Sequence, residues 1–237
     1  MMQEHQGYRD YFQLNNPLTR FKSIIAYRAR VKMFKHFMFL ASPGEKDRIL
    51  DVGVTPDTTL PESNFFEKFY PFLQNITMTS VEDATCLKDI FSGAEFVRTE
   101  PNEKLPFEDK QFDILFCSAV LEHVGDYPQQ RFFLSECFRV ANKIYLTTPN
   151  KAFPVEFHTY LPLVHYLPRA AHQKILSTLG LDFYARTQNL NLLTKKKLLS
   201  LIPESDARFA SIYCNRLLGF TTNLILFVDM TVKDLKI

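Results

Sequence analysis

Short apolar runs alternate with longer mixed segments between residues 48 and 149 of this chain. Each run is five to seven residues long and ends in small or polar residues, which is typical of buried parallel strands. We predict strands at 48–53, 76–81, 94–98, 112–118 and 143–148, with helices at 64–73, 85–91 and 128–140. This alternation predicts an α/β domain built on a parallel sheet with right-handed crossovers.

The strand–helix rhythm breaks after residue 150. Residues 151–205 contain Pro154, Pro162 and Pro168 and one helix-like stretch, 170–179, and we interpret them as an insertion at the carboxyl edge of the sheet. Two further strands, 210–215 and 223–230, are predicted with a short connection that suits an antiparallel pair. The sequence thus predicts a mostly parallel sheet of seven strands with an antiparallel terminal hairpin, in a domain spanning residues 45–237.

A basic helix is predicted ahead of this domain, within an N-terminal extension that spans residues 1–44. Between Tyr11 and Gly44 there are six basic residues and no acidic one. Apolar residues recur at helical spacing and define the predicted buried face: Phe21, Ile24, Ile25, Val31, Phe34 and Met38. We interpret this helix as packed on the domain with its charged edge in water. The alternative is contact with an anionic group, either a phosphate of a ligand or a membrane surface.

Composition and charge narrow the function classes. At 237 residues and a net charge of +2, the chain suits one main domain without general affinity for nucleic acid. Its four cysteines have no paired spacing, so neither a zinc site nor a disulfide framework is expected. No signal peptide is evident, and no apolar run reaches the ~18 residues that a membrane span requires. We therefore expect a cytoplasmic protein, and the sequence carries no indication of its oligomeric state.

Acidic and small residues follow the predicted strands at the edge where open α/β sheets bind ligands. Asp51 and Gly53 end the first strand, and Glu82 and Asp83 follow the second. A strand-to-helix turn after Gly53 would present backbone N–H groups and a helix N-terminus to a ligand. An acid after the second strand can accept hydrogen bonds from both hydroxyls of a ribose, although acids at this place also cap helices.

Residues 105–124 carry the most informative motif in the chain. The polar turn Leu-Pro-Phe-Glu-Asp-Lys-Gln-Phe-Asp runs into a buried strand, which is followed by Ser118, Glu122 and His123. This motif resembles the fourth-strand motif of class I S-adenosylmethionine (SAM)-dependent methyltransferases of the methyltransferase type 11 kind. The resemblance covers most of residues 45–230, and it implies a Rossmann-like fold and SAM as the cofactor.

The resemblance also implies which residues bind each part of the cofactor. Asp51 and Gly53 match the turn for the methionine half, to which the Thr55 hydroxyl can add a hydrogen bond, and Ser118 lies beside the sulfonium. Glu82, or else Asp83, matches the acid for the ribose. The acid that contacts the adenine falls at Pro101 in this chain, so Glu100 takes its place after a shift of one residue. The chain departs from the family at residues 54–56, where Val-Thr-Pro stands in place of further glycines. Side chains there would occupy space that bare backbone leaves free in relatives.

Two histidines are candidates for a general base. If the methyl acceptor is a hydroxyl or ammonium group, a proton must leave, and an imidazole titrates near neutral pH. His123 follows the fourth strand. Glu156 and His158 follow the fifth, where alternation by two in an extended segment would aim both side chains the same way. Shaping the pocket is the alternative role for these residues. Nothing fixes four metal ligands, so no metal is expected.

The acceptor is the least constrained part of the prediction. Residues 149–162 resemble bacterial methyltransferases of surface-polysaccharide or nucleotide-sugar pathways, so we expect methyl transfer to an oxygen or nitrogen of a small, sugar-like acceptor that can bear a phosphate. Three alternatives stay open: a nucleic-acid acceptor, a non-catalytic binding module, and a nicotinamide-dependent reductase. The chain contains no Gly-rich Lys-Ser/Thr phosphate loop, no His-Glu-x-x-His zinc helix and no Gly-x-Ser-x-Gly hydrolase elbow.

Overall fold

The computed structural model describes residues 17–217 and 219–232, with side chains described from residue 23 onward. Within these residues one sheet of seven strands runs in the order β3-β2-β1-β4-β5-β7-β6. The strands are β1 (Ile49–Val52), β2 (Ile76–Ser80), β3 (Glu95–Arg98), β4 (Phe112–Ser118), β5 (Ala141–Pro149), β6 (Ala210–Leu217) and β7 (Phe220–Asp229). Strands β1 to β5 pair in parallel, and β7 pairs antiparallel with β5 and β6. The predicted fold class is confirmed.

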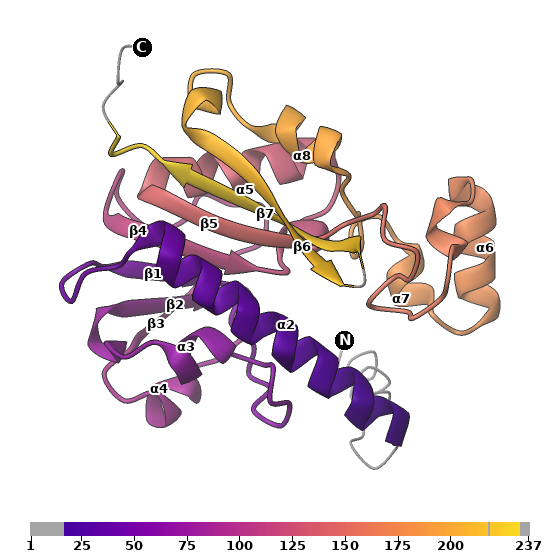
Figure 1. The fold of residues 1–237 in the computed structure, drawn as a ribbon, viewed down its shortest axis with the longest axis horizontal. Coiled ribbons are helices and arrows are strands. Elements are labelled where there is room, and N and C mark those ends of the chain that lie inside the picture. Colours follow the sequence, from indigo (N-terminus) through magenta and orange to yellow (C-terminus); the bar gives the residue numbers. More distant parts are fainter. Residues whose placement is uncertain (1–16, 218, 233–237) are drawn as a thin grey trace.

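Helices cover both faces of the sheet (Figure 1). One face carries α2 (Pro17–Ala41), α3 (Phe65–Phe69) and α4 (Leu87–Ile90), and the other carries α5 (Tyr127–Val140) and α8 (Lys195–Leu201). Beyond the carboxyl ends of the parallel strands lie α6 (Arg169–Thr178) and α7 (Asp182–Ala185). Short 3₁₀ helices are η1 (Leu73–Asn75), η2 (Leu121–His123), η3 (Val164–Tyr166) and η4 (Ala207–Phe209). No helix in the described part of the chain is long and apolar enough to cross a membrane.

Aromatic side chains fill the layer between α2, α3 and the sheet. Phe66 stacks on Phe116 with ring centroids 4.3 Å apart, and Phe116 stacks on Tyr145 at 5.7 Å. Each such buried side chain contributes about 1.5–3 kcal/mol of transfer free energy. The hydroxyl of Tyr145 donates to the main-chain oxygen of Met33 at 2.9 Å. The sheet therefore fixes α2 by apolar packing and by a satisfied buried hydroxyl.

The buried face of α2 agrees with the predicted one in part: Phe34 and Met38 are half-buried and pack against the core, but the most buried residues are others. Met33, Phe37 and Ala41 are buried and form a stripe with a spacing of four residues along the C-terminal half of the helix. Ile24, which was predicted on the buried face, is 44% exposed. The C-terminal half lies over the sheet, whereas the N-terminal half extends past its edge (Figure 1), so apolar residues there have less to pack against. Residues 1–16 of the predicted extension lie outside the described residues.

Proline and capping chemistry set two element boundaries. Helix α3 ends at Phe69, short of the predicted residue 73, because the next residue precedes Pro71 and is extended. Helix α5 is preceded by Asp126, whose side chain accepts a hydrogen bond from the main-chain N–H of Gln129, while the Gln129 side chain accepts one in return. This reciprocal cap orients α5 and fixes the end of the segment that follows β4.

Residues 151–193 form a lobe at the carboxyl edge. Its small core consists of Leu176, Tyr184 and Leu190. The two ends of the lobe meet, because the main-chain N–H of Lys151 donates to the carbonyl of Leu193 at 2.9 Å. Helix α8, which also lies within the predicted 151–205 insertion, packs Leu198 and Leu201 into the main core on the α5 face.

Candidate active site

The carboxyl edge of the sheet gathers segments from four neighbouring strands. Val52 of β1 pairs with Thr79 of β2 and with Cys117 of β4, so the residues that follow these positions leave the sheet side by side. The end of β2 is likewise aligned with the end of β3. The predicted cofactor-binding residues at or after these strand ends are Asp51, Gly53, Thr55, Glu82, Asp83, Glu100 and Ser118.

Gly53 is required by the turn that follows β1. Its φ of +99° lies in the left-handed region that other residues rarely adopt. A Cβ atom built at this position would also overlap Cγ2 of Val120, which follows β4. The glycine therefore allows the turn after β1 to approach the segment after β4.

The loop 53–64 between β1 and α3 is held together by its own polar groups. The side chain of Asn64 accepts from the main-chain N–H of Thr55 at 3.0 Å and donates to the Thr55 carbonyl at 2.8 Å. The Thr55 hydroxyl accepts from the main-chain N–H of Asp57 at 3.3 Å. Val54 is buried and packs in the core on the α3 face. The predicted strand-to-helix turn is thus a longer loop, and α3 behind it is only five residues long.

Asp51 lies next to a second buried acid, Glu67 of α3. Burial raises the pKa of Asp51 well above its usual value, and the charge of Glu67 raises it further. Burial also raises the pKa of Glu67. Neither oxygen of Glu67 has a hydrogen-bond partner among the described residues, so nothing there offsets the cost of ionising two neighbouring buried carboxyl groups. The signal for Glu67 in the sequence is an acid placed directly after two phenylalanines, which our prediction did not use.

The two acids after β2 differ in their hydrogen bonds. Oδ1 of Asp83 accepts from the main-chain N–H of Thr85 at 3.1 Å and from its hydroxyl at 2.6 Å, which stabilises the turn into α4. Glu82 is exposed, and its carboxylate makes no hydrogen bond or ion pair with the described residues. Glu100, which follows β3, is also exposed. The capping role therefore applies to Asp83, and the Glu82 carboxylate is available to a ligand.

Ser118, the last residue of β4, is contacted by α2. Nη1 of Arg30 donates to Oγ of Ser118 at 3.1 Å, and the same oxygen lies 2.9 Å from Oγ1 of Thr147 on β5. Burial lowers the pKa of Arg30, but the charges of Glu122 and Glu62 oppose that effect and the guanidinium stays charged. Sequence reasoning missed this role, because nothing distinguishes Arg30 from the other basic residues of the helix.

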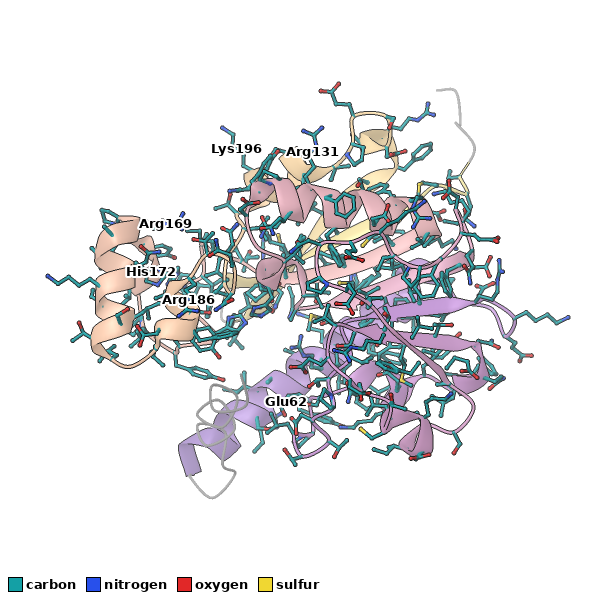
Figure 2. All side chains as sticks on the ribbon, turned by 180° about the vertical axis from the view of Figure 1, so that it is seen from behind. Glu62, Arg131, Arg169, His172, Arg186 and Lys196 are labelled. Atoms are coloured by element: carbon teal, nitrogen blue, oxygen red, sulfur yellow. The ribbon has the colours of Figure 1, made fainter. Side chains whose placement is uncertain are left out.

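Helix α2 also contacts the loop that follows β1. The hydroxyl of Ser23 donates to the carboxylate of Glu62 at 2.6 Å, and Figure 2 shows Glu62 at this junction. Together with the contact of Arg30 to Ser118, this makes α2 one wall of the carboxyl edge.

Glu122, in η2 directly after β4, is completely buried. One carboxylate oxygen, Oε2, accepts from the hydroxyl of Thr148 at 2.9 Å. The other, Oε1, has no hydrogen-bond partner among the described residues. Leaving a buried polar atom unpaired costs about 1–3 kcal/mol, and more for a charged group. Nearby, Ala119 has a φ of +58°, and such backbone strain clusters at functional sites.

The three predicted catalytic residues form one hydrogen-bonded chain between the sheet and the lobe. Nε2 of His123 lies 3.0 Å from Nε2 of His158, and Nδ1 of His158 lies 2.6 Å from Oε1 of Glu156. Nδ1 of His123 lies 2.6 Å from the main-chain carbonyl oxygen of Asn189, so this nitrogen carries a proton. Asn189 is a partner that sequence reasoning missed, since a main-chain carbonyl leaves no signature in a sequence.

Glu156 and His158 meet through a turn, so the predicted extended segment is wrong. The carboxylate of Glu156 accepts from the main-chain N–H groups of His158 and Thr159, each at 2.7 Å. The main-chain N–H of Tyr160 donates to the carbonyl of Glu156, also at 2.7 Å. The carboxylate thus folds back on its own backbone and reaches the imidazole from there.

Burial and Glu156 together set the charges along this chain. Burial alone would raise the pKa of Glu156, but the hydrogen bond and charge of His158 outweigh it and lower the pKa to about 2. Burial likewise lowers the pKa of His158, but Glu156 outweighs it, so the net pKa is raised. For His123, burial lowers the pKa by more than the charge of Glu122 raises it. Glu156 is therefore charged at neutral pH, and of the two rings His158 binds a proton more readily than His123.

Other polar groups of the lobe stabilise its backbone and its position. Nε2 of His165 lies 2.9 Å from the carbonyl oxygen of Phe153, and the hydroxyl of Tyr166 donates to the Ala152 carbonyl at 2.7 Å. The main-chain N–H of Asn191 donates to the carbonyl of Glu122 at 2.7 Å. The lobe is therefore bonded to η2 beside the histidine pair.

Comparison with known families gives one match. Residues 74–143 match the family described as a methyltransferase domain. The matched segment contains β2, β3, β4 and α5, and with them the strand ends that carry Glu82, Glu100 and Ser118, whereas the turn after β1 and the lobe lie outside it. No curated protein matches the chain significantly.

Several solved structures share the fold at low sequence identity. A SAM-dependent methyltransferase from Methanosarcina mazei is 19% identical, with 79% of this chain and 94% of that chain covered and a TM-score of 0.50. Magnesium protoporphyrin IX methyltransferase from Synechocystis PCC 6803, with bound S-adenosylhomocysteine, is 11% identical, with coverages of 90% and 88% and a TM-score of 0.53. A Burkholderia thailandensis 1,6-didemethyltoxoflavin-N1-methyltransferase, bound to 1,6-didemethyltoxoflavin and S-adenosylhomocysteine, is 12% identical, with coverages of 84% and 77% and a TM-score of 0.53.

The residues at the carboxyl edge fit an adenosyl cofactor. Gly53 keeps the turn after β1 free of a side chain, and the carboxylate of Glu82 is available to accept hydrogen bonds from ribose hydroxyls. The methyltransferase match of residues 74–143 and the shared fold together support a SAM-dependent methyltransferase, an enzyme whose cofactor is S-adenosylmethionine.

Proposed function

We propose that this chain transfers the methyl group of SAM to an oxygen or nitrogen atom of a small acceptor of the sugar or nucleotide-sugar class. The acceptor would lie between the ends of β4 and β5 and the lobe. The observation that carries this proposal is the meeting of His123, His158 and Glu156 at that place. Hydroxyl and ammonium acceptors must lose a proton during transfer, and an imidazole–carboxylate pair is suited to receive it.

Our assignment of the cofactor-binding residues follows the strand ends. It gives Asp51, Gly53 and Thr55 to the methionine half, Glu82 to the ribose with Asp83 as the second choice, Glu100 to the adenine, and Ser118 to the neighbourhood of the sulfonium. When bound, the cofactor supplies an electrophilic methyl group on a positively charged sulfur. The free carboxylate of Glu82, compared with the internally bonded one of Asp83, supports the order of the two ribose candidates.

The hydrogen bonds of the ring nitrogens of His123 and His158 support an oxygen or nitrogen acceptor. The Nδ1 atoms of both rings are engaged, one by the Asn189 carbonyl and one by the Glu156 carboxylate. The two Nε2 atoms therefore face each other, and a proton taken from the acceptor can be held between the rings. Although burial opposes it, Glu156 raises the pKa of His158, which favours that uptake.

Arg30 supports an anionic group on the acceptor. It is the cation that α2 brings to Ser118 at the end of β4. A guanidinium is well matched to phosphate oxygens, because it offers a planar fork of N–H donors. A nucleotide sugar carries such phosphates close to its sugar.

Calorimetric titration of the full chain with S-adenosylhomocysteine tests the cofactor half. We expect the wild type to bind and Glu82→Ala to lose about 10–100-fold in affinity, since two hydrogen bonds to a carboxylate disappear. The matched control Asp83→Ala should bind almost as the wild type does, because its carboxylate is occupied by Thr85. Absence of binding by the wild type would leave a non-catalytic module as the interpretation.

Transfer of a radiolabelled methyl group from SAM tests the acceptor half. The labelled cofactor would be offered with nucleotide sugars, free sugars and amines, and the products separated by chromatography. We expect label on an oxygen or nitrogen of a nucleotide sugar. Transfer only to carbon or only to nucleic acid would contradict the proposal.

A further inference from the structure

We propose that Glu122, His123 and His158 form a binding site for one divalent transition-metal ion, because their free ligand atoms converge in a buried place. One atom from each residue, a carboxylate oxygen or an imidazole nitrogen, lies within 4.8 Å of the others. The assignment goes beyond the proposed function, which requires only SAM and an acceptor. Where it names the acceptor atom, it rests on that function.

The hydrogen bonds behind the two imidazoles are those that metal-binding histidines use. Nδ1 of His123 donates to the carbonyl of Asn189, and Nδ1 of His158 donates to the carboxylate of Glu156. Such partners fix the tautomer in which Nε2 carries a lone pair, and they orient the ring towards the ion. Both Nε2 atoms are thereby presented as ligands, with Asn189 and Glu156 as positioning residues.

The distance between the two rings matches a shared ion. Imidazole nitrogens bind first-row metals at about 2.1 Å, so two of them at right angles around one ion lie about 3.0 Å apart. The two Nε2 atoms lie 3.0 Å apart. A proton shared between the rings would give the same distance. The distance alone therefore does not distinguish a bound ion from a shared proton, and the Glu122 carboxylate provides the distinction.

Glu122 supplies the independent observation. The side chain is completely buried, yet its Oε1 has no hydrogen-bond partner among the described residues, while Oε2 is bonded to Thr148. A proton between the histidines leaves this oxygen unpaired. An ion bound to both rings gives it a partner, once the Glu122 side chain shifts towards them.

The charges around the site accommodate a divalent cation. Two buried carboxylates, Glu122 and Glu156, lie near the half-buried guanidinium of Arg30, whose pKa burial lowers against the charge of Glu122. No ion pair joins Arg30 to Glu122 among the side chains that the structure describes, so the carboxylate keeps its capacity as a ligand. Two imidazoles and one carboxylate favour Fe²⁺, Mn²⁺, Co²⁺ or Zn²⁺ over Ca²⁺.

Three protein ligands leave further coordination positions open, as in metal sites that act on substrates. An acceptor hydroxyl bound there would release its proton to solvent water more readily, because the ion would stabilise the alkoxide. The metal-bound state would therefore select oxygen as the methylated atom. Deprotonation assisted by the ion would then replace uptake of the proton by the histidine pair, since both Nε2 atoms would bind the ion.

Titration with Co²⁺ tests the site, because cobalt bound to nitrogen ligands absorbs visible light and needs no acceptor. The untagged full chain would be stripped with a chelator and titrated while absorbance and heat are recorded. We expect one Co²⁺ per chain, and an affinity at least about 10-fold lower for Glu122→Gln and for His158→Ala. The matched control is His172→Ala on α6 of the same lobe (Figure 2), a histidine outside the group of Glu122, His123 and His158, and it should bind as the wild type does.

The affinity for S-adenosylhomocysteine, measured on the same samples, reports whether each variant is folded. A wild type that binds S-adenosylhomocysteine but no Co²⁺ overturns the metal site and leaves the proposed function intact. Glu122→Gln and His158→Ala that bind Co²⁺ as tightly as His172→Ala also overturn it. Specific Co²⁺ binding by a chain that does not bind S-adenosylhomocysteine supports the metal site and overturns the proposed function.

Discussion

Two buried acidic clusters lie at the same edge of the sheet, one beside β1 and one in the lobe. Asp51 has Glu67 as its neighbour, and burial together with that neighbouring charge raises the pKa of Asp51. Glu156 has His158 and two main-chain N–H groups as neighbours, and although burial opposes it, its pKa falls to about 2. Similar burial thus accompanies raised pKa values in one cluster and a fully charged carboxylate in the other. The partner of a buried acid, more than its depth, decides its charge.

The two clusters also differ in what they touch. Glu67 is buried beside Asp51, and we assign it neither to the cofactor nor to the acceptor. Its expected influence is on the stability of the domain. Glu156 belongs to a chain of groups that ends at His123 beside the end of β4. We therefore expect changes in the lobe to alter the methyl-transfer rate, and a change at Glu67 to alter stability.

The largest expected effect comes from removing His158. His158→Ala should slow methyl transfer by about 10²–10⁴-fold, the usual contribution of a proton-transfer group, while the affinity for S-adenosylhomocysteine stays unchanged. Steady-state rates and calorimetry on the same preparation measure both quantities. His172→Ala is the matched control and should retain the wild-type rate. If His158→Ala transferred methyl groups as fast as this control, the lobe cluster would have no role in the reaction, and the contrast with the cluster beside β1 would be wrong.

Gly53→Ala should have the next largest effect, this time on stability. A methyl group there meets Val120 and forces a non-glycine residue to a φ of +99°, so we expect the free energy of unfolding to fall by about 2–5 kcal/mol. Gly180→Ala provides the control, because φ is +72° but nothing lies within 4 Å of the added Cβ. Its loss should be about 1 kcal/mol. Equal losses in urea unfolding of the two variants would show that contact with Val120 is unimportant.

The smallest effect concerns the pH dependence of stability. Because burial raises the folded pKa values of Asp51 and Glu67 above the unfolded values of ~4, the native state binds more protons in this range. The free energy of unfolding should therefore fall as pH rises from ~4 through the raised folded pKa values. Glu67→Gln removes one of the two acids and should make this decline shallower.

Urea unfolding of the full chain at a series of pH values measures that decline. Glu82→Gln, a change at an exposed acid, serves as the control and should follow the wild-type slope. If Glu67→Gln kept the same slope as well, the raised pKa of Glu67 would not be a source of the decline.

The sheet could be predicted from the sequence because its strands are local patterns. Five apolar runs with polar ends and a terminal pair with a short connection were sufficient for all seven described strands. The buried face of α2 was predicted only in part, at Phe34 and Met38. The stripe Met33, Phe37, Ala41 was present in the sequence, but large apolar residues around the rest of the helix obscured it.

The candidate site was predictable only as far as strand ends determine it. Their order brings the predicted residues to one edge, whereas the contacts that set their chemistry join distant segments. Arg30 and Ser118 are separated by 88 residues, and His123 and Asn189 by 66. Neither pair has a spacing or a residue type that a single sequence reveals, so the charge and tautomer of the site required the folded structure.

The carbonyl of Asn189 has a consequence for how this enzyme can be altered. It belongs to the main chain, so no exchange of side chain removes it from the imidazole of His123. The ring nitrogen that bears hydrogen is therefore determined by where the lobe docks against η2. Mutations that shift the lobe, even far from the histidines, would change which nitrogen of His123 carries hydrogen. They would thereby alter the chemistry of the site without replacing any residue within it.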